Sequence, residues 1–305
     1  MSRFPDGARV CFVGDSLVAA NQYLPRIIDH YNKYFPEANV RFFNCGISGG
    51  AYSGALDFFA DDVLCHNPTH VVVAYGINDS GRDILARPRS AARYNELVQR
   101  FENYKKCARA YAELVLSHGI NLTLVTPAPY DEYTPGDSPV LHGAYALMVG
   151  YSDFIRALSK ELGAELYDNN AYLCKVLETD TEQVFSPDRV HPTPHGYYLI
   201  AKGFLEYQGL TIDEEAPIPE HFEKWRETVH KLRVIFGAEH MLVKNYRMPT
   251  EEKIAKIEKM IADGKWSVPV LENFARGFLN EKLNQSALYS AIDEIYERDI
   301  APKGV

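Results

Sequence analysis

The chain has 305 residues, of which 46% are hydrophobic and 24% are charged, a composition typical of a globular protein with a substantial core. The net charge of -9 argues against nucleic acid as the main partner, because phosphate binding requires a basic surface. No apolar run approaches the roughly 20 residues that span a bilayer, and the first ten residues contain no apolar signal core, so we expect a cytoplasmic protein without a membrane span.

Short β-rich runs alternate with longer helical patterns along the first two thirds of the chain. The runs are nearly continuous in hydrophobicity, as in parallel strands covered on both faces, and they occupy 9–13, 40–44, 70–75, 121–126 and 165–167. Helical patterns lie near 19–35, 53–65, 90–118, 140–162 and 197–205. Gly119 and Gly163 stand where two of these helices would end. This alternation predicts an α/β fold, a three-layer α/β/α sandwich around a parallel sheet of about five strands.

Residues 213–305 differ from those before them. They hold 31 charged residues in 93, against 42 in the preceding 212, and they begin with an acidic segment that contains Pro217 and Pro219. Ile254, Ile257 and Ile261 recur at helical spacing. We therefore divide the chain into a main domain at 1–212 and a helical extension at 213–305. The extension would pack on that domain, cover it as a lid, or form a homo-oligomer interface.

Residues with reactive or hydrogen-bonding side chains follow the predicted strands. Ser16 ends a Gly-Asp-Ser tripeptide after the first strand, a glycine-rich turn at Gly49 follows the second, and Asn78 follows the third. Because ligands bind beyond the carboxyl ends of parallel strands, we expect these residues to lie close together. Far downstream, Asp188 and His191 offer a carboxylate and an imidazole that could activate a serine hydroxyl.

Taken in this order, the four motifs resemble those of the SGNH hydrolase (GDSL-type esterase/lipase) family over roughly residues 8–208. The resemblance implies that Ser16 is the nucleophile, His191 the general base and Asp188 the acid that orients it. It also implies an oxyanion hole made of the backbone N–H groups of Ser16 and Gly49 with the side chain of Asn78. Residues 1–212 would then be the catalytic domain, whereas 213–305 have no counterpart.

A second serine competes for the role of nucleophile. The segment around Ser48 fits G-x-S-x-G, the nucleophile elbow of α/β-hydrolases, and it also follows a strand. Only one predicted strand precedes Ser48, however, and no HGGG-like segment lies upstream. We therefore favour Ser16 and keep Ser48 as the alternative that an experiment must exclude.

The predicted activity is hydrolysis of carboxylic esters through an acyl-enzyme, a chemistry that needs no metal and no organic cofactor. The scattered cysteines form no CxxC pair, and no HExxH motif occurs. His191 and His195 are four positions apart, but two prolines between them disfavour ligation from one helix face. We therefore predict neither a metal site nor a cofactor.

The loops at 79–90 and 127–142 are the predicted selectivity loops, and Asp79, Arg82 and Tyr130 are candidate substrate-binding residues. Their aromatic and polar side chains suit a small polar ester better than a long acyl chain. We therefore favour a short-acyl ester, such as an acetylated carbohydrate. The alternatives are a lipase, lysophospholipase or thioesterase on the same site, and a non-catalytic binding protein on this fold.

Overall fold

A central sheet of five parallel strands organises the structure, a computed structural model that describes residues 3–135, 138–212, 217–227, 262 and 294–301. The strands are β1 (Arg9–Gly14), β2 (Arg41–Gly46), β3 (His70–Ala74), β4 (Asn121–Val125) and β5 (Glu165–Tyr167). They lie in the order β2-β1-β3-β4-β5. The chain therefore changes direction across the sheet between β1 and β3, and the crevice beyond such a switch point is where α/β sheets bind ligands.

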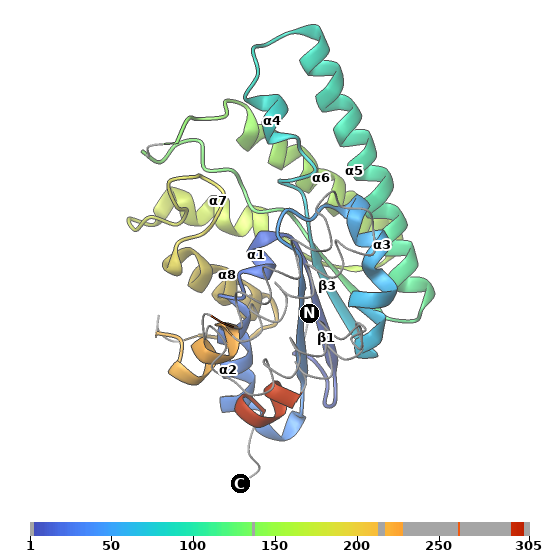
Figure 1. Cartoon of the computed structure of the whole chain (residues 1–305), viewed down its shortest axis with the longest axis vertical. Helices are drawn as coiled ribbons and strands as arrows, with labels where there is room; N and C mark the ends of the chain where they lie inside the picture. Colours follow the sequence, from blue (N-terminus) through green and yellow to red (C-terminus); the bar gives the residue numbers. More distant parts are fainter. Residues whose placement is uncertain (1–2, 136–137, 213–216, 228–261, 263–293, 302–305) are drawn as a thin grey trace. The chain divides into compact units, whose positions relative to one another are not determined.

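Helices cover both faces of this sheet, which confirms the predicted α/β sandwich (Figure 1). They are α1 (Ser16–Ala19), α2 (Leu24–Tyr34), α3 (Tyr52–Asp62), α4 (Arg82–Leu85), α5 (Ala91–Ser117), α6 (Ala144–Leu162), α7 (Asn169–Thr179) and α8 (Pro194–Tyr207), with short 3-10 turns at η1 (Pro36–Ala38) and η2 (Leu64–His66).

Alternate residues of the strands point to opposite layers. Cys11 and Val13 of β1 belong to the buried cluster that includes residues of α3, α5 and α6. Phe12, between them, faces the other layer, where its ring meets that of Phe204 in α8 at 5.3 Å between centroids. Burial on both faces explains why the strands are almost continuously hydrophobic in sequence.

Two local features depart from the predicted elements. The helix expected over 19–35 begins later, as α2 at Leu24, because α1 has ended at Ala19 and Asn21 has a φ of 52° in the left-handed region. Asparagine tolerates this conformation, and its side-chain oxygen accepts a hydrogen bond from Asn44 Nδ2 at 2.9 Å. Helices α4 and α7 were not predicted. By contrast, Gly119 and Gly163 end α5 and α6 with φ values of 71° and 67°, as their positions indicated.

The chain separates into two compact units, Met1–Ala216 and Pro217–Val305. In the second unit the described residues include buried Trp225 and Tyr296, whose ring centroids are 6.0 Å apart. The helix predicted from Ile254, Ile257 and Ile261 lies outside the described residues, so the domain division at 212/213 stays a prediction. Among the described helices, none has the length and hydropathy that crossing a membrane requires.

Candidate active site

The turn after β1 places Ser16 at the first position of α1. Asp15 caps this helix, because its Oδ1 accepts a hydrogen bond from Leu17 N–H at 3.0 Å. The turn is too tight for a side chain at Gly14, since a Cβ there would lie 2.6 Å from the carbonyl oxygen of Ala74. Glycine thus lets β1, β3 and the serine turn approach one another at the sheet edge.

The turn before α8 holds a carboxylate and an imidazole together. Asp188 Oδ1 accepts hydrogen bonds from Val190 N–H at 3.0 Å, from His191 N–H at 2.9 Å and from the Ser186 hydroxyl at 2.8 Å. Its Oδ2 lies 2.5 Å from His191 Nδ1. Partial burial raises the pKa of Asp188, but the hydrogen bonds from His191, Val190 and Ser186 outweigh it and hold that pKa below its usual value. The carboxylate is therefore ionised at neutral pH.

The two turns meet at Ser16 and His191. Ser16 Oγ lies 2.8 Å from His191 Nε2, although 175 positions separate the residues. An ionised Asp188 beside Nδ1 keeps the imidazole proton on that nitrogen, which leaves Nε2 free to accept the serine proton. The three side chains thus form one continuous hydrogen-bonded chain.

The turns after β2 and β3 lie against the serine turn. Ile47 N–H donates to Gly14 O at 2.8 Å, and Gly50 N–H donates to Ile47 O at 2.8 Å. Gly49, at the tip of the first of these turns, has a φ of 75°. Asn78 Nδ2 donates to Gly50 O at 2.9 Å, so one of its two amide hydrogens ties the turns together. Among the described residues no other acceptor takes the second hydrogen.

Asp79 lies in the interior behind this edge. It is 6% exposed, its Oδ1 accepts from Tyr52 N–H at 3.1 Å, and its Oδ2 has no hydrogen-bond partner among the described residues. Burial raises the pKa of Asp79 to about 7, and the neighbouring charge of Asp15 adds to the shift. Burial likewise raises the pKa of Asp15 to about 6. Both carboxyls therefore carry a proton over part of the neutral range.

The other candidate residues occupy different surroundings. Arg82 begins α4, is half-buried, and its positive charge favours ionisation of Asp15. Tyr130 is 1% exposed, and its hydroxyl accepts a hydrogen bond from Leu141 N–H at 3.1 Å. Tyr130 therefore links two ends of the loop at 127–142 from its buried side. Ser48 is exposed and, in the described part of the chain, makes no hydrogen bond to a histidine.

The sequence profile of the GDSL-like lipase/acylhydrolase family matches residues 12–199. This range covers more than half of the chain and runs from β1 into α8. The chain belongs to the GDSL-like lipase/acylhydrolase family. It is therefore an enzyme that hydrolyses esters, which confirms the resemblance drawn from the motifs.

Two curated relatives resemble this family member. The acetylxylan esterase of Geobacillus stearothermophilus is 23% identical over 219 residues, which cover 67% of this chain and 95% of the relative. An uncharacterized lipoprotein of Bacillus subtilis (strain 168) is 28% identical over 193 residues, which cover 56% of this chain and 75% of the relative. The first match covers nearly the whole of the esterase, so most of the unmatched residues belong to our chain.

Solved structures share the fold. A catalytic mutant of the Geobacillus stearothermophilus acetylxylan esterase superposes with a TM-score of 0.58 at 20% identity, covering 70% of this chain and 100% of that chain. A gut microbial diltiazem-metabolizing enzyme gives a TM-score of 0.60 at 23% identity, covering 68% of this chain and 48% of that chain. Our chain thus matches about half the length of the second enzyme.

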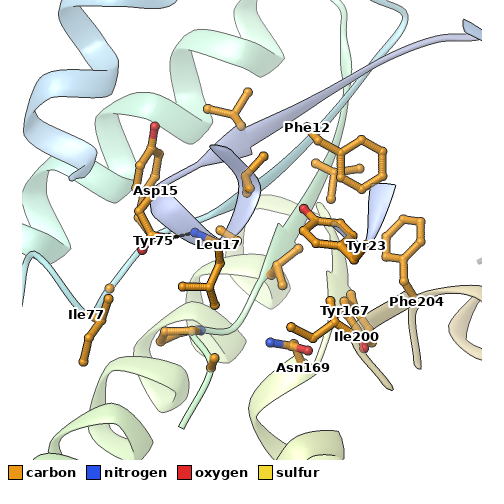
Figure 2. Close-up of a pocket in the computed structure, with 18 of the residues that line it drawn as sticks. Phe12, Asp15, Leu17, Tyr23, Tyr75, Ile77, Tyr167, Asn169, Ile200 and Phe204 are labelled. Atoms are coloured by element: carbon orange, nitrogen blue, oxygen red, sulfur yellow. Dashed lines mark hydrogen bonds between the residues drawn. The ribbon is translucent and has the colours of Figure 1, made fainter. Parts of the chain in front are cut away.

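An apolar cavity of about 60 Å³ lies at the sheet edge of this GDSL-like hydrolase (Figure 2). Leu17, Ile77 and Val190 line it, and each is the sequence neighbour of Ser16, Asn78 or His191. Farther in, the lining includes aromatic and aliphatic side chains: Phe12, Tyr23, Tyr167, Ile200 and Phe204. The residues next to Ser16, Asn78 and His191 therefore line one apolar cavity, and packing around it couples their positions.

Arg189 is a residue that the sequence alone did not single out. It is 5% exposed, and its φ of 67° is unusual for a residue with a side chain. Its guanidinium donates to the carbonyl oxygens of Ser138 at 3.1 Å, Asp131 at 3.2 Å and Thr134 at 2.6 Å. Asp131 N–H in turn donates to Arg189 O at 3.1 Å. The turn that holds Asp188 and His191 is thus fastened to the loop after β4.

The neighbouring histidine has a separate partner. His195 Nε2 lies 2.9 Å from Asp180 Oδ2 and is not hydrogen-bonded to Ser16. No group of three or more histidine, cysteine or acidic side chains in the described part of the chain has an arrangement that could hold a metal ion.

Proposed function

We propose that this hydrolase is a serine esterase in which Ser16, His191 and Asp188 perform the chemistry. The observation that carries the proposal is the hydrogen-bonded chain from Ser16 Oγ through His191 to Asp188, with distances of 2.8 Å and 2.5 Å. A serine hydroxyl is a weak nucleophile until a base within hydrogen-bond reach takes its proton. His191 Nε2 is within that reach, and Asp188 holds the imidazole in the required tautomer.

In the first half-reaction His191 Nε2 takes the proton as Ser16 Oγ attacks the ester carbonyl carbon. The backbone N–H groups of Ser16 and Gly49 and the side-chain amide of Asn78 stabilise the oxyanion that forms. The imidazolium then gives its proton to the departing alcohol. The products of this half-reaction are the free alcohol and an acyl ester on Ser16.

In the second half-reaction water takes the place of the alcohol, and the proton transfers of the first half-reaction occur in reverse. His191 takes a proton from water, the resulting hydroxide attacks the acyl carbonyl, and the Ser16 oxygen leaves with the proton from His191. The carboxylic acid is released and the enzyme is restored. Asp188, held ionised by its four hydrogen bonds, stabilises the imidazolium in both halves.

For the substrate, we infer a short-acyl ester, with an acetylated carbohydrate favoured. The relative whose sequence is covered to 95% by the match is an acetylxylan esterase, which supports this inference. The test is a panel of p-nitrophenyl esters from acetyl to dodecanoyl, with rates expected to be highest for the shortest chains. A preference for the long acyl chains would overturn the inference about the substrate and leave the esterase proposal standing.

A further inference from the structure

We propose that Tyr133 and Tyr145 form an aromatic platform that binds a sugar ring of the substrate beside the catalytic turn. This inference rests on the proposed esterase function and extends it, because it assigns a second contact to an acetylated oligosaccharide. The bond to be cleaved would lie at Ser16, and a neighbouring sugar unit would stack on the platform.

The two rings form a pair in which Tyr133 is exposed and Tyr145 is half-buried. Tyr133 is 76% exposed, the highest value among the large hydrophobic side chains of the described residues. Its ring centroid lies 5.5 Å from that of Tyr145, with an interplanar angle of 71°. Edge-to-face contact of this kind fixes the rings relative to each other. A large part of the Tyr133 ring is therefore open to a ligand.

The backbone that carries the platform is held by side chains of its own loop. Asp131 Oδ1 accepts from the N–H groups of Tyr133 at 3.2 Å and of Thr134 at 3.0 Å. Glu132 Oε2 accepts from Tyr145 N–H at 3.2 Å, so the second ring is tied to the same loop. A surface that is ordered before binding loses little conformational entropy when a ligand docks. The hydrogen bonds of the loop thus hold the backbone of Tyr133 in the conformation that exposes its ring.

Arg189 connects the platform to the catalytic turn. Its guanidinium binds the carbonyl oxygens of Asp131 and Thr134, which flank Tyr133, and its own carbonyl accepts from Asp131 N–H. Tyr133 is two positions from Asp131, and His191 is two positions from Arg189. Extended chain and one hydrogen bond then limit the backbone distance from Tyr133 to His191 to about 20 Å. This upper limit lies within the reach of a short oligosaccharide.

The surroundings of the rings fit a carbohydrate. Beside Tyr133, the Glu132 carboxylate lies 3.4 Å from His142 Nδ1, and the His142 side chain is 74% exposed. A sugar ring presents C–H groups to an aromatic face and hydroxyls to such polar neighbours. A stable protein interface needs about 800 Å² per partner, far more than two tyrosine rings supply. The chemistry therefore favours a sugar ring over a second copy of this chain.

The test compares a small and a large substrate on the full-length protein. Tyr133→Ala is measured on p-nitrophenyl acetate and on an acetylated xylo-oligosaccharide. We expect KM for the oligosaccharide to rise about tenfold, equivalent to about 1.4 kcal/mol, with kcat and the p-nitrophenyl acetate kinetics unchanged. Tyr133→Trp should keep KM near the wild-type value. Tyr94→Ala is the matched control, because Tyr94 is 67% exposed on α5, and it should change neither substrate.

An unchanged KM for the oligosaccharide in Tyr133→Ala would overturn the platform, and so would an equal loss on both substrates. A shift in molar mass by light scattering between wild type and Tyr133→Ala would also overturn it, in favour of a subunit contact. Calorimetric titration with unacetylated xylo-oligosaccharide separates this inference from the esterase proposal. Binding that Tyr133→Ala weakens about tenfold supports the platform even if the wild type hydrolyses no ester, a result that would refute the esterase proposal alone.

Discussion

Ser16 Oγ and His191 Nε2 lie 2.8 Å apart although 175 positions separate the two residues. Ser16 is placed by the end of β1 and the start of α1, and His191 by the turn that precedes α8. Their approach therefore requires β1 and the helix layer that contains α8, where Phe12 packs on Phe204, to be in place. Activity should consequently report the folding of this part of the hydrolase.

Replacement of Asp188 by Asn should lower kcat by about 10⁴, because a neutral amide favours the wrong imidazole tautomer and does not stabilise the imidazolium. The measurement is kcat for p-nitrophenyl acetate between pH 6 and 9. Asp180→Asn is the matched control, because Asp180 also pairs with a histidine, His195, at 2.9 Å, whereas Ser16 is hydrogen-bonded to His191. This variant should keep near wild-type activity. Comparable losses in the two variants would contradict the role given to Asp188.

Asn78→Ala should lower kcat by about 10²–10³ with little change in KM, because the amide acts on the oxyanion rather than on the bound ester. Steady-state kinetics on p-nitrophenyl acetate provide the measurement. Asn121→Ala serves as the control, because the Asn121 amide also donates to a backbone carbonyl, that of Thr69. Asn121 lies at the start of β4, whereas Asn78 follows the carboxyl end of β3. A variant that changes KM alone would show that Asn78 binds substrate instead.

Asp79→Asn should make the protein more stable at pH 8 than the wild type. Burial raises the pKa of Asp79 from 3.8 to about 7, so between these values the folded protein binds more protons than the unfolded chain. Stability then falls as the pH rises through this window, and it is fully retained only below pH 3.8. The difference in Tm between variant and wild type should therefore grow from pH 4 to pH 8.

The control for this prediction is Asp83→Asn, because the Asp83 side chain is 72% exposed. Its Tm difference from wild type should stay constant over the same range. If Asp79→Asn also gave a constant difference, Asp79 would have to titrate normally in the folded protein.

Arg189→Gly should release the loop after β4 from the catalytic turn. Glycine adopts the φ of 67° without strain, so the substitution removes the guanidinium contacts and keeps the backbone conformation. We expect amide hydrogen exchange at 131–135 to accelerate about tenfold, with β1 unchanged. Arg189→Lys should recover part of the protection. Unaltered exchange at 131–135 would mean that other contacts hold the loop.

Much of the fold could be predicted because strands buried on both faces carry a plain hydrophobic signal. The break at Asn21 was missed because it depends on a hydrogen bond from Asn44, which is distant in sequence. Helix α7 was missed as well, although Asp168 caps it through a bond to Ala171 N–H at 3.2 Å, a local signal that the sequence does contain.

The candidate site shows the same division. Its motifs follow the strands, so the topology of a parallel sheet brings Ser16, Gly49 and Asn78 to one edge. The sequence does not show which way a side chain turns from a loop: Tyr130 is 1% exposed and Tyr133, three positions later, is 76% exposed. Nor does it show that Arg189 binds three carbonyls of another loop. An arginine beside a motif is usually exposed.

The most direct test of the esterase proposal is to label the protein with a fluorophosphonate and locate the adduct by mass spectrometry, together with turnover of p-nitrophenyl acetate. We expect one adduct, on Ser16, and expect Ser16→Ala to lose both labelling and turnover while Ser48→Ala keeps both. Labelling and turnover that persist in Ser16→Ala and disappear in Ser48→Ala would contradict the proposal.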